Sequence, residues 1–527
     1  MHALAFLAVA TTIVVGGGED AAATVADGGA CGNGRVIPDD RELELFHTVT
    51  DHGAWRGATF ESTDEVLRFR GEVVMAADET VYVEGAARVA SRRRARVLEV
   101  GRHGHLAREI LRAGAAQYVV LEPNRGVFDA ALGLALETAA SASPFLGFWE
   151  ENAPLLRSGQ FDGVLYDAFP DVADSTFFAE ARRLLRPGGA LAFFLEGCGE
   201  RSAPPTPETA TRECGDWGLA RSRLLDAGWL PGELKEPVPM RVSLGFEHSG
   251  ARRTRTMLVT EAVRAPAGGA AAVPVPDRAA LDRDLRAAAP ELATRGEWQA
   301  LPAAPRVDDA DAGNASLIID GAVVMDTQEA AYMVDLAGNL AGAASVLEIG
   351  YGLGLAAAAI QRLGAVDDGA GNGRDVEEHV IVEANAAVLR ALLASDLGAR
   401  SGVKALLGFW QEVVPLLRAE SFDAVFFDPF PNDLERLGGA CAHQRGFMAE
   451  AFRVLRPGGV FVYMSGSSDE ASVEADTAAA LAAGFLPGDV DITVRDYPMV
   501  DDLCAEYPNC AHFDHSVLMT RLVKAPA

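Results

Sequence analysis

The chain has 527 residues, too many for one compact domain, and its length predicts roughly two to four domains, with two as the simplest expectation. Its 46 Lys and Arg residues against 75 Asp and Glu residues give a formal charge of -29, which disfavours nucleic acids and anionic membrane faces as partners. Hydrophobic residues make up 49% of the chain and charged residues 23%, as in globular proteins with buried cores.

Residues 1–38 begin with an apolar run that extends through Val15 and is followed by small residues. The run is too short to span a bilayer and lacks a basic n-region, so it suits either a targeting leader or a flexible or docked terminus. No other stretch approaches a transmembrane length. We expect a cytoplasmic protein without stable membrane association, with organellar or secretory targeting as the alternative.

A whole block of the sequence occurs twice with its internal order intact, which indicates a duplicated domain. In chain order the matching pairs are VLEVG (97–101) and VLEIG (346–350), VVLEPN and VIVEAN, LGFWEENAPLLR and LGFWQEVVPLLR, FDGVLYDAFP and FDAVFFDPFP, and LLRPGGALAFF and VLRPGGVFVYM. Upstream, the copies share Trp55 with Trp298, Met75 with Met325, Glu79 with Glu329 and Tyr82 with Tyr332. The three middle pairs are separated by 261 residues, and different offsets on either side locate two loop insertions in the second copy.

The stretch between the copies is rich in Ala, Pro and Gly and has no hydrophobic periodicity, as an interdomain connection would. We therefore predict a first domain at residues 39–263, a linker at 264–280 and a second domain at 281–527.

Each copy alternates short β-branched runs with helical patterns. The first copy reads ARVLEV, HLAREILRAGA and YVVLEP, and the second reads SVLEIG, LAAAAIQRLGA and HVIVEA. Continuous apolar strands separated by amphipathic helices predict an α/β fold, with a mostly parallel, doubly wound sheet in each of two tandem Rossmann-like domains. A ligand should lie beyond the carboxyl ends of the strands.

The residues at these strand ends suit a nucleoside-containing ligand. Gly350, Gly352 and Gly354 follow the first strand of the second copy, where glycines let the backbone approach a ligand closely, although a structural tight turn is the alternative. Glu383 ends the second strand, where a carboxylate can accept both hydroxyls of a ribose. Glu122 stands in the same setting in the first copy, which weakens the alternative of a merely exposed Glu.

Asp428 follows the fourth strand of the second copy within the segment FFDPFP. A carboxylate that emerges from a buried strand into an aromatic, proline-rich turn is partly desolvated, so it favours a cationic partner and can accept a proton from it. A guanidinium or amine substrate would suit it, whereas an Asp that only caps the next turn is the structural alternative.

Together the segments VLEIGYGLGLA, VIVEAN, GFWQEVVPLL, FDAVFFDPFP and AFRVLRPGG resemble guanidinoacetate N-methyltransferases. The resemblance runs from about Trp298 to the C-terminus and includes GAVVMDTQEAAYM before the first strand. It implies an S-adenosylmethionine-dependent methyltransferase of the creatine-forming type, acting on a small guanidino or amino compound, with the second domain as the more secure catalyst. The sulfonium supplies the reactive methyl group, so no metal is predicted.

The resemblance also implies site roles. Asp428 and Glu329 would clamp the guanidinium, with Asp428 accepting its proton. Glu383 and the Gly350, Gly352 and Gly354 loop would hold the cofactor, and Trp410 follows the segment that covers its adenine. Trp298 would close the pocket, and Gly466 and Ser467 would meet the substrate carboxylate. The matching residues of the first copy are Asp167 and Glu79 as catalytic groups, Gly101, Gly104, Glu122 and Trp149 around the cofactor, and Trp55 at the substrate.

The first copy departs from this pattern at two places. His103 stands where the second copy has Gly352, and Glu196 and Gly197 replace Gly466 and Ser467. A side chain in the loop would crowd the cofactor, and Glu196 would repel a substrate carboxylate. We therefore expect the first copy to be either a methyltransferase for another amine or a weakened domain that supports the second.

Two alternative functions and one arrangement of the two copies are also compatible with the sequence. A protein-arginine N-methyltransferase relative would need a surface groove for polypeptide, whereas Glu329 and Trp298 favour a closed small pocket. A binding protein would retain cofactor affinity without turnover in one or both copies. The tandem could also form an intramolecular pseudo-dimer.

The six cysteines are too few and too scattered for a disulfide scaffold or a zinc ribbon. Cys504 and Cys510 lie close to His512 and His515, but their spacing fits no standard zinc pattern. Reduced thiols are expected.

Overall fold

The computed structural model describes residues 61–62, 66–69, 72–76, 80–90, 95–101, 104–137, 141–167, 175–196, 215–235, 238–244, 253–265, 295–309, 314–363, 376–430, 441–464, 469–497 and 516–526. Several predicted features lie outside these residues: the leader, nearly all of the linker, Trp55, Glu79, His103, Gly466, Ser467, and the Cys504 and Cys510 pair. None of the helices that are described is both long and apolar enough to cross a membrane.

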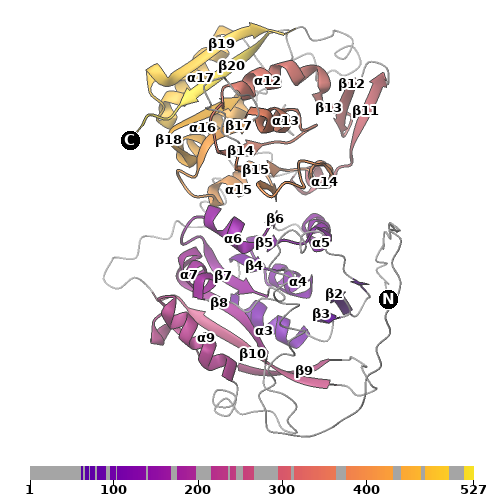
Figure 1. Cartoon of the computed structure of the whole chain (residues 1–527), viewed down its shortest axis with the longest axis vertical. Coiled ribbons are helices and arrows are strands. Elements are labelled where there is room, and N and C mark those ends of the chain that lie inside the picture. The colour runs from indigo at the N-terminus through magenta and orange to yellow at the C-terminus, as the bar shows by residue number, and fades with distance from the viewer. Residues whose placement is uncertain are drawn as a thin grey trace, which may run out of the picture. The chain divides into compact units, whose positions relative to one another are not determined.

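The first half is an α/β unit built on seven strands in the order β6-β5-β4-β7-β8-β10-β9 (Figure 1). All neighbouring strands are parallel except at β10, which runs antiparallel to both β8 and β9. Its elements are β4 (Arg96–Val100), α4 (Gly104–Arg112), β5 (Gln117–Glu122), α5 (Arg125–Glu137), β6 (Ser141–Leu146), α6 (Trp149–Asn152), η2 (Ala153–Leu155), β7 (Phe161–Tyr166), α7 (Ser175–Leu184), β8 (Leu185–Glu196), α9 (Gly215–Asp226), η3 (Pro231–Glu233), β9 (Val238–Leu244) and β10 (Arg253–Val263).

The second half repeats this topology in the order β16-β15-β14-β17-β18-β20-β19, which confirms the predicted doubly wound, mostly parallel sheets. Its elements are β14 (Ser345–Ile349), α13 (Leu355–Arg362), β15 (Glu378–Glu383), α14 (Ala386–Ala394), β16 (Val403–Leu407), α15 (Trp410–Val413), η7 (Val414–Leu416), β17 (Phe422–Phe427), α16 (Cys441–Val454), β18 (Leu455–Tyr463), α17 (Glu470–Ala483), η8 (Pro487–Asp489), β19 (Val490–Asp496) and β20 (Ser516–Val523).

Each half begins with a small antiparallel sheet that the sequence patterns did not reveal. In the first half β1 (Glu61–Ser62), β2 (Val66–Phe69) and β3 (Glu72–Ala76) precede α3 (Thr80–Ala90). In the second half the elements are α11 (Arg295–Ala300), β11 (Ala303–Asp309), β12 (Asn314–Ile319), β13 (Ala322–Asp326), η5 (Thr327–Glu329) and α12 (Ala330–Gly338). The second of these sheets matters for function because β12 and β13 line the candidate site.

The strands are apolar on both sides because helices cover both faces of the sheet. In β14, Val346 packs into the cluster beneath α12, α13 and α14, whereas the next residue, Leu347, packs into the cluster beneath α15, α16 and α17. This two-residue alternation is that of an extended strand, and burial on both faces explains why these strands read as unbroken apolar runs.

The two seven-stranded sheets join into one sheet of 14 strands through β6 and β16, which run antiparallel with Phe145 opposite Leu406. Beside them, Leu156 and Leu417 form an isolated antiparallel bridge. The backbone N–H of Arg157 donates to the carbonyl oxygen of Leu416 at 2.7 Å, and that of Arg418 donates to the carbonyl oxygen of Leu155 at 2.7 Å. Backbone pairing therefore continues from one half into the other.

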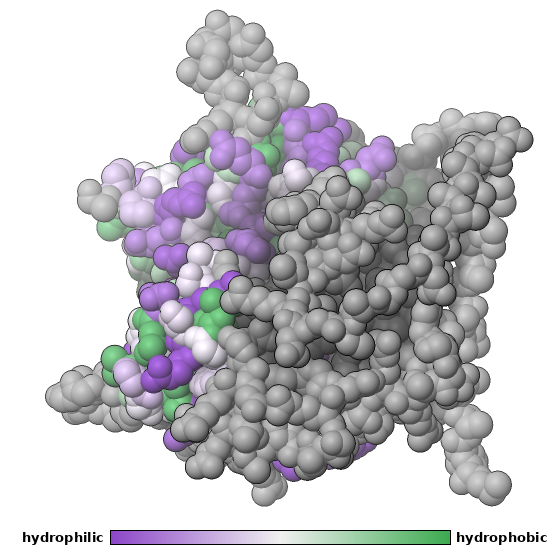
Figure 2. All heavy atoms as spheres, turned by 60° about the horizontal axis from the view of Figure 1, so that its bottom comes forward, coloured by the Kyte–Doolittle hydropathy of each residue, from purple (hydrophilic) through white to green (hydrophobic). Residues whose placement is uncertain are grey.

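The coloured residues on the face shown in Figure 2 are mainly hydrophilic, with hydrophobic residues in small groups. Among the residues whose side chains are described, the large hydrophobic ones that are exposed are Leu219, Leu230, Val334, Leu481, Leu486 and Val494. Scattered exposed apolar residues of this kind are ordinary for a folded protein.

Candidate active site

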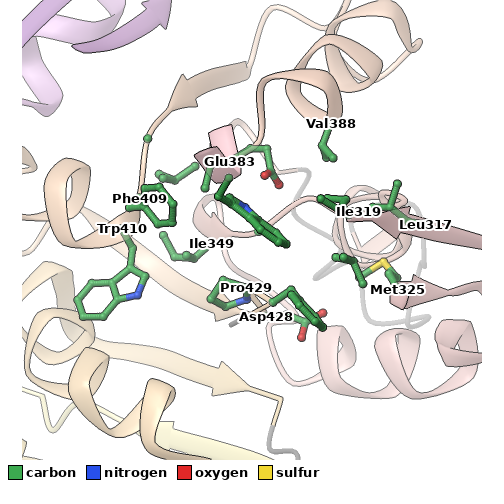
Figure 3. A pocket seen from close by; sticks show the side chains of 18 residues that line it. Leu317, Ile319, Met325, Ile349, Glu383, Val388, Phe409, Trp410, Asp428 and Pro429 are labelled. Carbon is green, nitrogen blue, oxygen red and sulfur yellow. The ribbon is translucent and has the colours of Figure 1, made fainter. Parts of the chain in front are cut away.

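A cavity of the second half lies where the strand order reverses, beyond the carboxyl ends of β14, β15 and β17. Ligands of doubly wound sheets bind at such a crevice. Figure 3 shows Glu383 on one side of the cavity and Asp428 with Pro429 on the opposite side. The lining residues are Trp298, Leu317, Ile319, Val324, Met325, Ile349, Gly350, Gly352, Val382, Glu383, Ala384, Val388, Gly408, Phe409, Trp410, Asp428, Pro429 and Phe430.

The loop after β14 needs glycine at its key positions for steric reasons. Gly350 has φ 86°, and a Cβ atom there would lie 2.6 Å from the carbonyl oxygen of Asp428. Gly352 has φ 55°, and its Cβ would lie 2.7 Å from the sulfur of Met325. Gly354, at the N-cap of α13, is also in the left-handed region. The loop therefore runs close to β17 on one side and to β13 on the other, with its backbone facing the cavity.

Glu383 is buried at the end of β15, and backbone donors hold its carboxylate. Its Oε1 accepts from the N–H of Asn385 at 2.6 Å, and its Oε2 accepts from the N–H of Tyr351 at 2.9 Å. Burial raises the pKa of this carboxyl, while the backbone hydrogen bonds oppose the rise. These backbone donors fix the orientation of the carboxylate, which is an acceptor-only group that suits the hydroxyls of a diol.

Asn385 is a site residue that sequence reasoning missed. Its Oδ1 caps α14 by accepting from the N–H groups of Ala387 and Val388 at 2.9 and 3.1 Å. Its Nδ2 donates to the carbonyl oxygens of Trp298 and Leu301, both at 3.0 Å. This one amide therefore ties the segment that carries Trp298 to the strand that ends in Glu383. The sequence did contain a signal for this residue, because an Asn ends both repeated motifs, VVLEPN and VIVEAN.

The family resemblance paired Asp428 with Glu329, and in the structure the charge of Glu329 acts on the carboxyl of Asp428. Burial raises the pKa of Glu329 to about 7, and the charge of Asp326 adds to the rise. Burial also raises the pKa of Asp428 well above its ordinary value, and the nearby carboxylates of Glu329 and Glu348 contribute. Glu329 is not one of the residues that line the cavity, and its Oε1 accepts from the N–H of Asp326 at 2.8 Å. A positive charge bound beside Asp428 would lower both pKa values.

Tyr332 adds a polar group to this cluster that the sequence analysis did not place in the site. Its side chain is fully buried, and its hydroxyl has no hydrogen-bond partner among the residues the structure describes. The charges of Asp428 and Glu329 both raise its pKa, after burial, which is the main cause. Tyr332, Glu329 and Asp428 therefore form one electrostatically coupled cluster on the Asp428 side of the cavity.

Aromatic side chains shape the rest of the cavity. The Trp298 ring stacks on Phe430, with ring centroids 5.9 Å apart and planes 10° from parallel. Trp410 lines the cavity in part, but its indole points away from the other labelled side chains in Figure 3. Its ring packs edge-on against Phe447, with centroids 5.1 Å apart, so it supports the loop from outside rather than covering a ligand.

The first half keeps the scaffold of this site. Glu122 is buried and accepts from the N–H of Asn124 at 2.7 Å, as Glu383 does from Asn385. The backbone N–H of Asp167 donates to the carbonyl oxygen of Val100 at 2.9 Å, the same contact that Asp428 makes with Ile349. Gly101 has φ 77°, Gly104 begins α4, and Trp149 packs edge-on against Phe177 at 5.2 Å. The backbone at the ends of β4, β5 and β7 therefore repeats the geometry at the ends of β14, β15 and β17.

The comparisons with known proteins agree with this geometry. The family model for guanidinoacetate N-methyltransferase matches two segments, residues 47–200 and 293–474, one in each half. A protein of Mycolicibacterium vanbaalenii, provisionally named an O-methyltransferase, is 32% identical over 175 residues, which cover 32% of this chain and 70% of that protein. A Mycobacterium avium protein with the same provisional name is 29% identical over 179 residues, which cover 33% of this chain and 73% of that protein.

Solved structures give weaker likenesses. Spermidine synthase from Thermotoga maritima has a TM-score of 0.28 and 18% identity, over 40% of this chain and 72% of that chain. The 16S rRNA N2 G1207 methyltransferase of T. thermophilus has a TM-score of 0.26 and 16% identity, over 90% of this chain and 99% of that chain. These scores are too low to support an inference. On the family match over both halves, the chain belongs to the guanidinoacetate N-methyltransferase family and is an S-adenosylmethionine-dependent methyltransferase.

Proposed function

We propose that the second half methylates a nitrogen of a small guanidino or amino compound, with a guanidinoacetate-like acceptor as the best single candidate. The observation that carries the proposal is Asp428, which lies on the side of the cavity opposite Glu383 and whose pKa is raised by burial and by the neighbouring carboxylate of Glu329. Two neighbouring carboxylates with raised pKa values are stabilised by a cationic ligand, and a guanidinium is planar and can be held bidentately by a carboxylate.

The residues of the cavity fit S-adenosylmethionine as the methyl donor. Glu383 offers a preoriented carboxylate for the ribose hydroxyls, and the backbone of Gly350 and Gly352 lines the cavity without side chains. When bound, the cofactor supplies an electrophilic methyl group on its sulfonium.

The chain's own residues prepare the acceptor. A guanidinium is protonated at neutral pH and has no free lone pair on the nitrogen to be methylated. Asp428 would orient it and accept a proton from that nitrogen, while Glu329 keeps the surroundings negative. Trp298 stacked on Phe430 would close the cavity against water, and the tether from Asn385 holds Trp298 in place.

A direct test is a methyl-transfer assay on the full chain with guanidinoacetate, other guanidino acids, primary amines, an arginine-containing peptide and a hydroxyl compound. Transfer to a guanidino or amino nitrogen supports the proposal. Transfer only to the peptide would favour a protein-arginine methyltransferase, and transfer only to the hydroxyl compound would favour the function named for the mycobacterial relatives. Cofactor binding with no transfer to any acceptor would favour a binding protein.

A further inference from the structure

We propose that the first half is a built-in partner subunit, and that its contacts hold the cofactor side of the second half's cavity in shape. The proposal rests on the assignment of that cavity to the cofactor. It concerns β6 and α5 of the first half and β16, α14 and α11 of the second.

The contacts between the halves follow a two-fold symmetry. Phe145 and Leu406, which face each other across β6 and β16, are equivalent positions of the repeat, 261 residues apart. The bridge between Leu156 and Leu417 again joins equivalent positions. The reciprocal backbone bonds of Arg157 and Arg418 obey the same rule. An interface in which each position meets its own equivalent is that of a two-fold dimer, here contained in one chain.

Side chains across this interface are not symmetric, and the differences favour pairing of unlike halves. Asp129 and Arg390 are equivalent positions, and Arg390 Nε lies 2.6 Å from Asp129 Oδ1. Two copies of the first half would place Asp opposite Asp, and two copies of the second would place Arg opposite Arg. Like charges at such positions oppose the wrong pairing.

A second asymmetric pair of contacts holds α15, which follows β16, and α6, which follows β6. Gln117 Nε2 donates to the carbonyl oxygen of Glu412 at 3.1 Å. At the symmetry-related place Lys404 Nζ donates to the carbonyl oxygen of Glu151 at 2.7 Å and pairs with Glu378 at 2.6 Å. Lys404 is nearly buried, and its equivalent in the first half is a serine. Each half therefore uses a different side chain to hold a backbone carbonyl oxygen of the other half.

These contacts reach the cavity itself. Gly408 lines it, and a Cβ atom on Gly408 would lie 3.3 Å from the hydroxyl of Ser143 in the first half. Arg125 donates to the carbonyl oxygen of Leu393 at 2.6 Å and also to that of Gly398, so it holds the end of α14, the helix that Asn385 caps. Helix α11, which carries Trp298, contacts α5. Three elements of the cavity wall are therefore supported from the first half.

The test is the double variant Arg125→Ala with Asp129→Arg, made in the full chain. It removes the support of α14 and sets two arginines against each other, while leaving every cavity-lining residue in place. By titration calorimetry we expect the S-adenosylmethionine Kd of the second-half site, identified by its loss in Glu383→Ala, to rise roughly threefold to tenfold. Amide hydrogen exchange in residues 386–398, which cover α14 and the turn that Arg125 holds, should speed up without any ligand. Arg88→Ala, which removes only an exposed pair with Glu84 on α3, should change neither value.

The charge swap Asp129→Arg with Arg390→Asp keeps an opposite-charge pair and should stay within about twofold of the unaltered chain. Sedimentation should give the mass of one chain. Unchanged exchange in the disrupted variant would overturn the proposal, as would a mass of two chains. If the unaltered chain binds no S-adenosylmethionine, the proposed function fails, whereas the exchange experiment still decides whether the first half supports α14.

Discussion

At the scale of single residues, the candidate site depends on carboxylates that are buried or half-buried before any substrate arrives. Burial raises the pKa of Glu329, Asp428 and Glu383, so each is held in its charged form less readily than in water. Such desolvation costs stability unless a partner compensates it. Asp428 has the carboxylate of Glu329 as a neighbour instead of a cation, so a bound cation would offset the repulsion between the two.

We predict that Asp428→Asn abolishes methyl transfer and changes the S-adenosylmethionine Kd by less than about threefold, because the amide keeps the volume but cannot accept the proton. Transfer rates and calorimetry on the same preparation provide the measurement. Asp167→Asn is the matched control in the first half and should leave the second-half activity intact. A large loss of cofactor affinity in Asp428→Asn would show that Asp428 serves the cofactor instead.

Glu329 makes stability depend on pH in a defined direction. Its pKa rises from 4.5 in an unfolded chain to about 7 in the folded one, so between these values the folded chain binds the proton more tightly. The free energy of unfolding should therefore fall as pH rises from about 5 to 8, by up to about 3 kcal/mol from this group. Glu329→Gln should flatten that part of the curve, as measured by chemical denaturation at several pH values. An equally steep fall in the variant would contradict the assignment.

Glu383→Ala should raise the S-adenosylmethionine Kd of the second half roughly 10- to 100-fold, because hydrogen bonds to a charged acceptor contribute on the order of 1.5–3 kcal/mol. Calorimetry on the full chain also gives the number of S-adenosylmethionine sites. Glu122→Ala is the counterpart in the first half: its effect reports whether that half binds the cofactor at all. An unchanged Kd in Glu383→Ala would remove the ribose role from this residue.

At the scale of elements, the strands and the residues at their ends were predictable, whereas the tethers between elements were not. Unbroken apolar runs located β14, β15 and β17, and the acidic residues at the ends of β15 and β17 were identified from the repeat. Asn385 escaped because a helix-capping Asn looks the same in sequence whether or not its Nδ2 holds a distant segment. The buried pair of Glu348 and His379, 2.7 Å apart, also escaped, because it joins neighbouring strands.

The tether from Asn385 gives a prediction at this scale. Asn385→Ala removes the cap of α14 and frees the segment of Trp298, so it should raise the acceptor KM as well as cost about 1 kcal/mol of stability. Asn124→Ala removes the equivalent cap of α5 and should cost similar stability without changing the acceptor KM. Steady-state kinetics and thermal unfolding of both variants provide the comparison. Equal KM values in the two variants would show that Asn385 acts only as a helix cap and does not position Trp298.

At the scale of the whole molecule, the sequence reveals the duplication but not how the copies meet. The pairing of β6 with β16 depends on backbone groups, which carry no sequence pattern of their own. The charge asymmetry at Asp129 and Arg390 becomes meaningful only when the two positions are known to face each other. The two insertions in the second copy were visible in sequence, and both fall largely outside the described residues.

The continuous sheet has a consequence for how the gene can be divided. Strands β6 and β16 protect each other's open hydrogen-bonding edge, and Phe145 and Leu406 at their crossing are both buried. Either half produced alone would present that edge to solvent as a template for unwanted strand addition. Truncation into separate domains should therefore yield aggregation-prone fragments, and co-expression of the two halves should restore solubility. Once the copies were fused in this way, loss of either one would expose the other, so an inactive copy would still be retained.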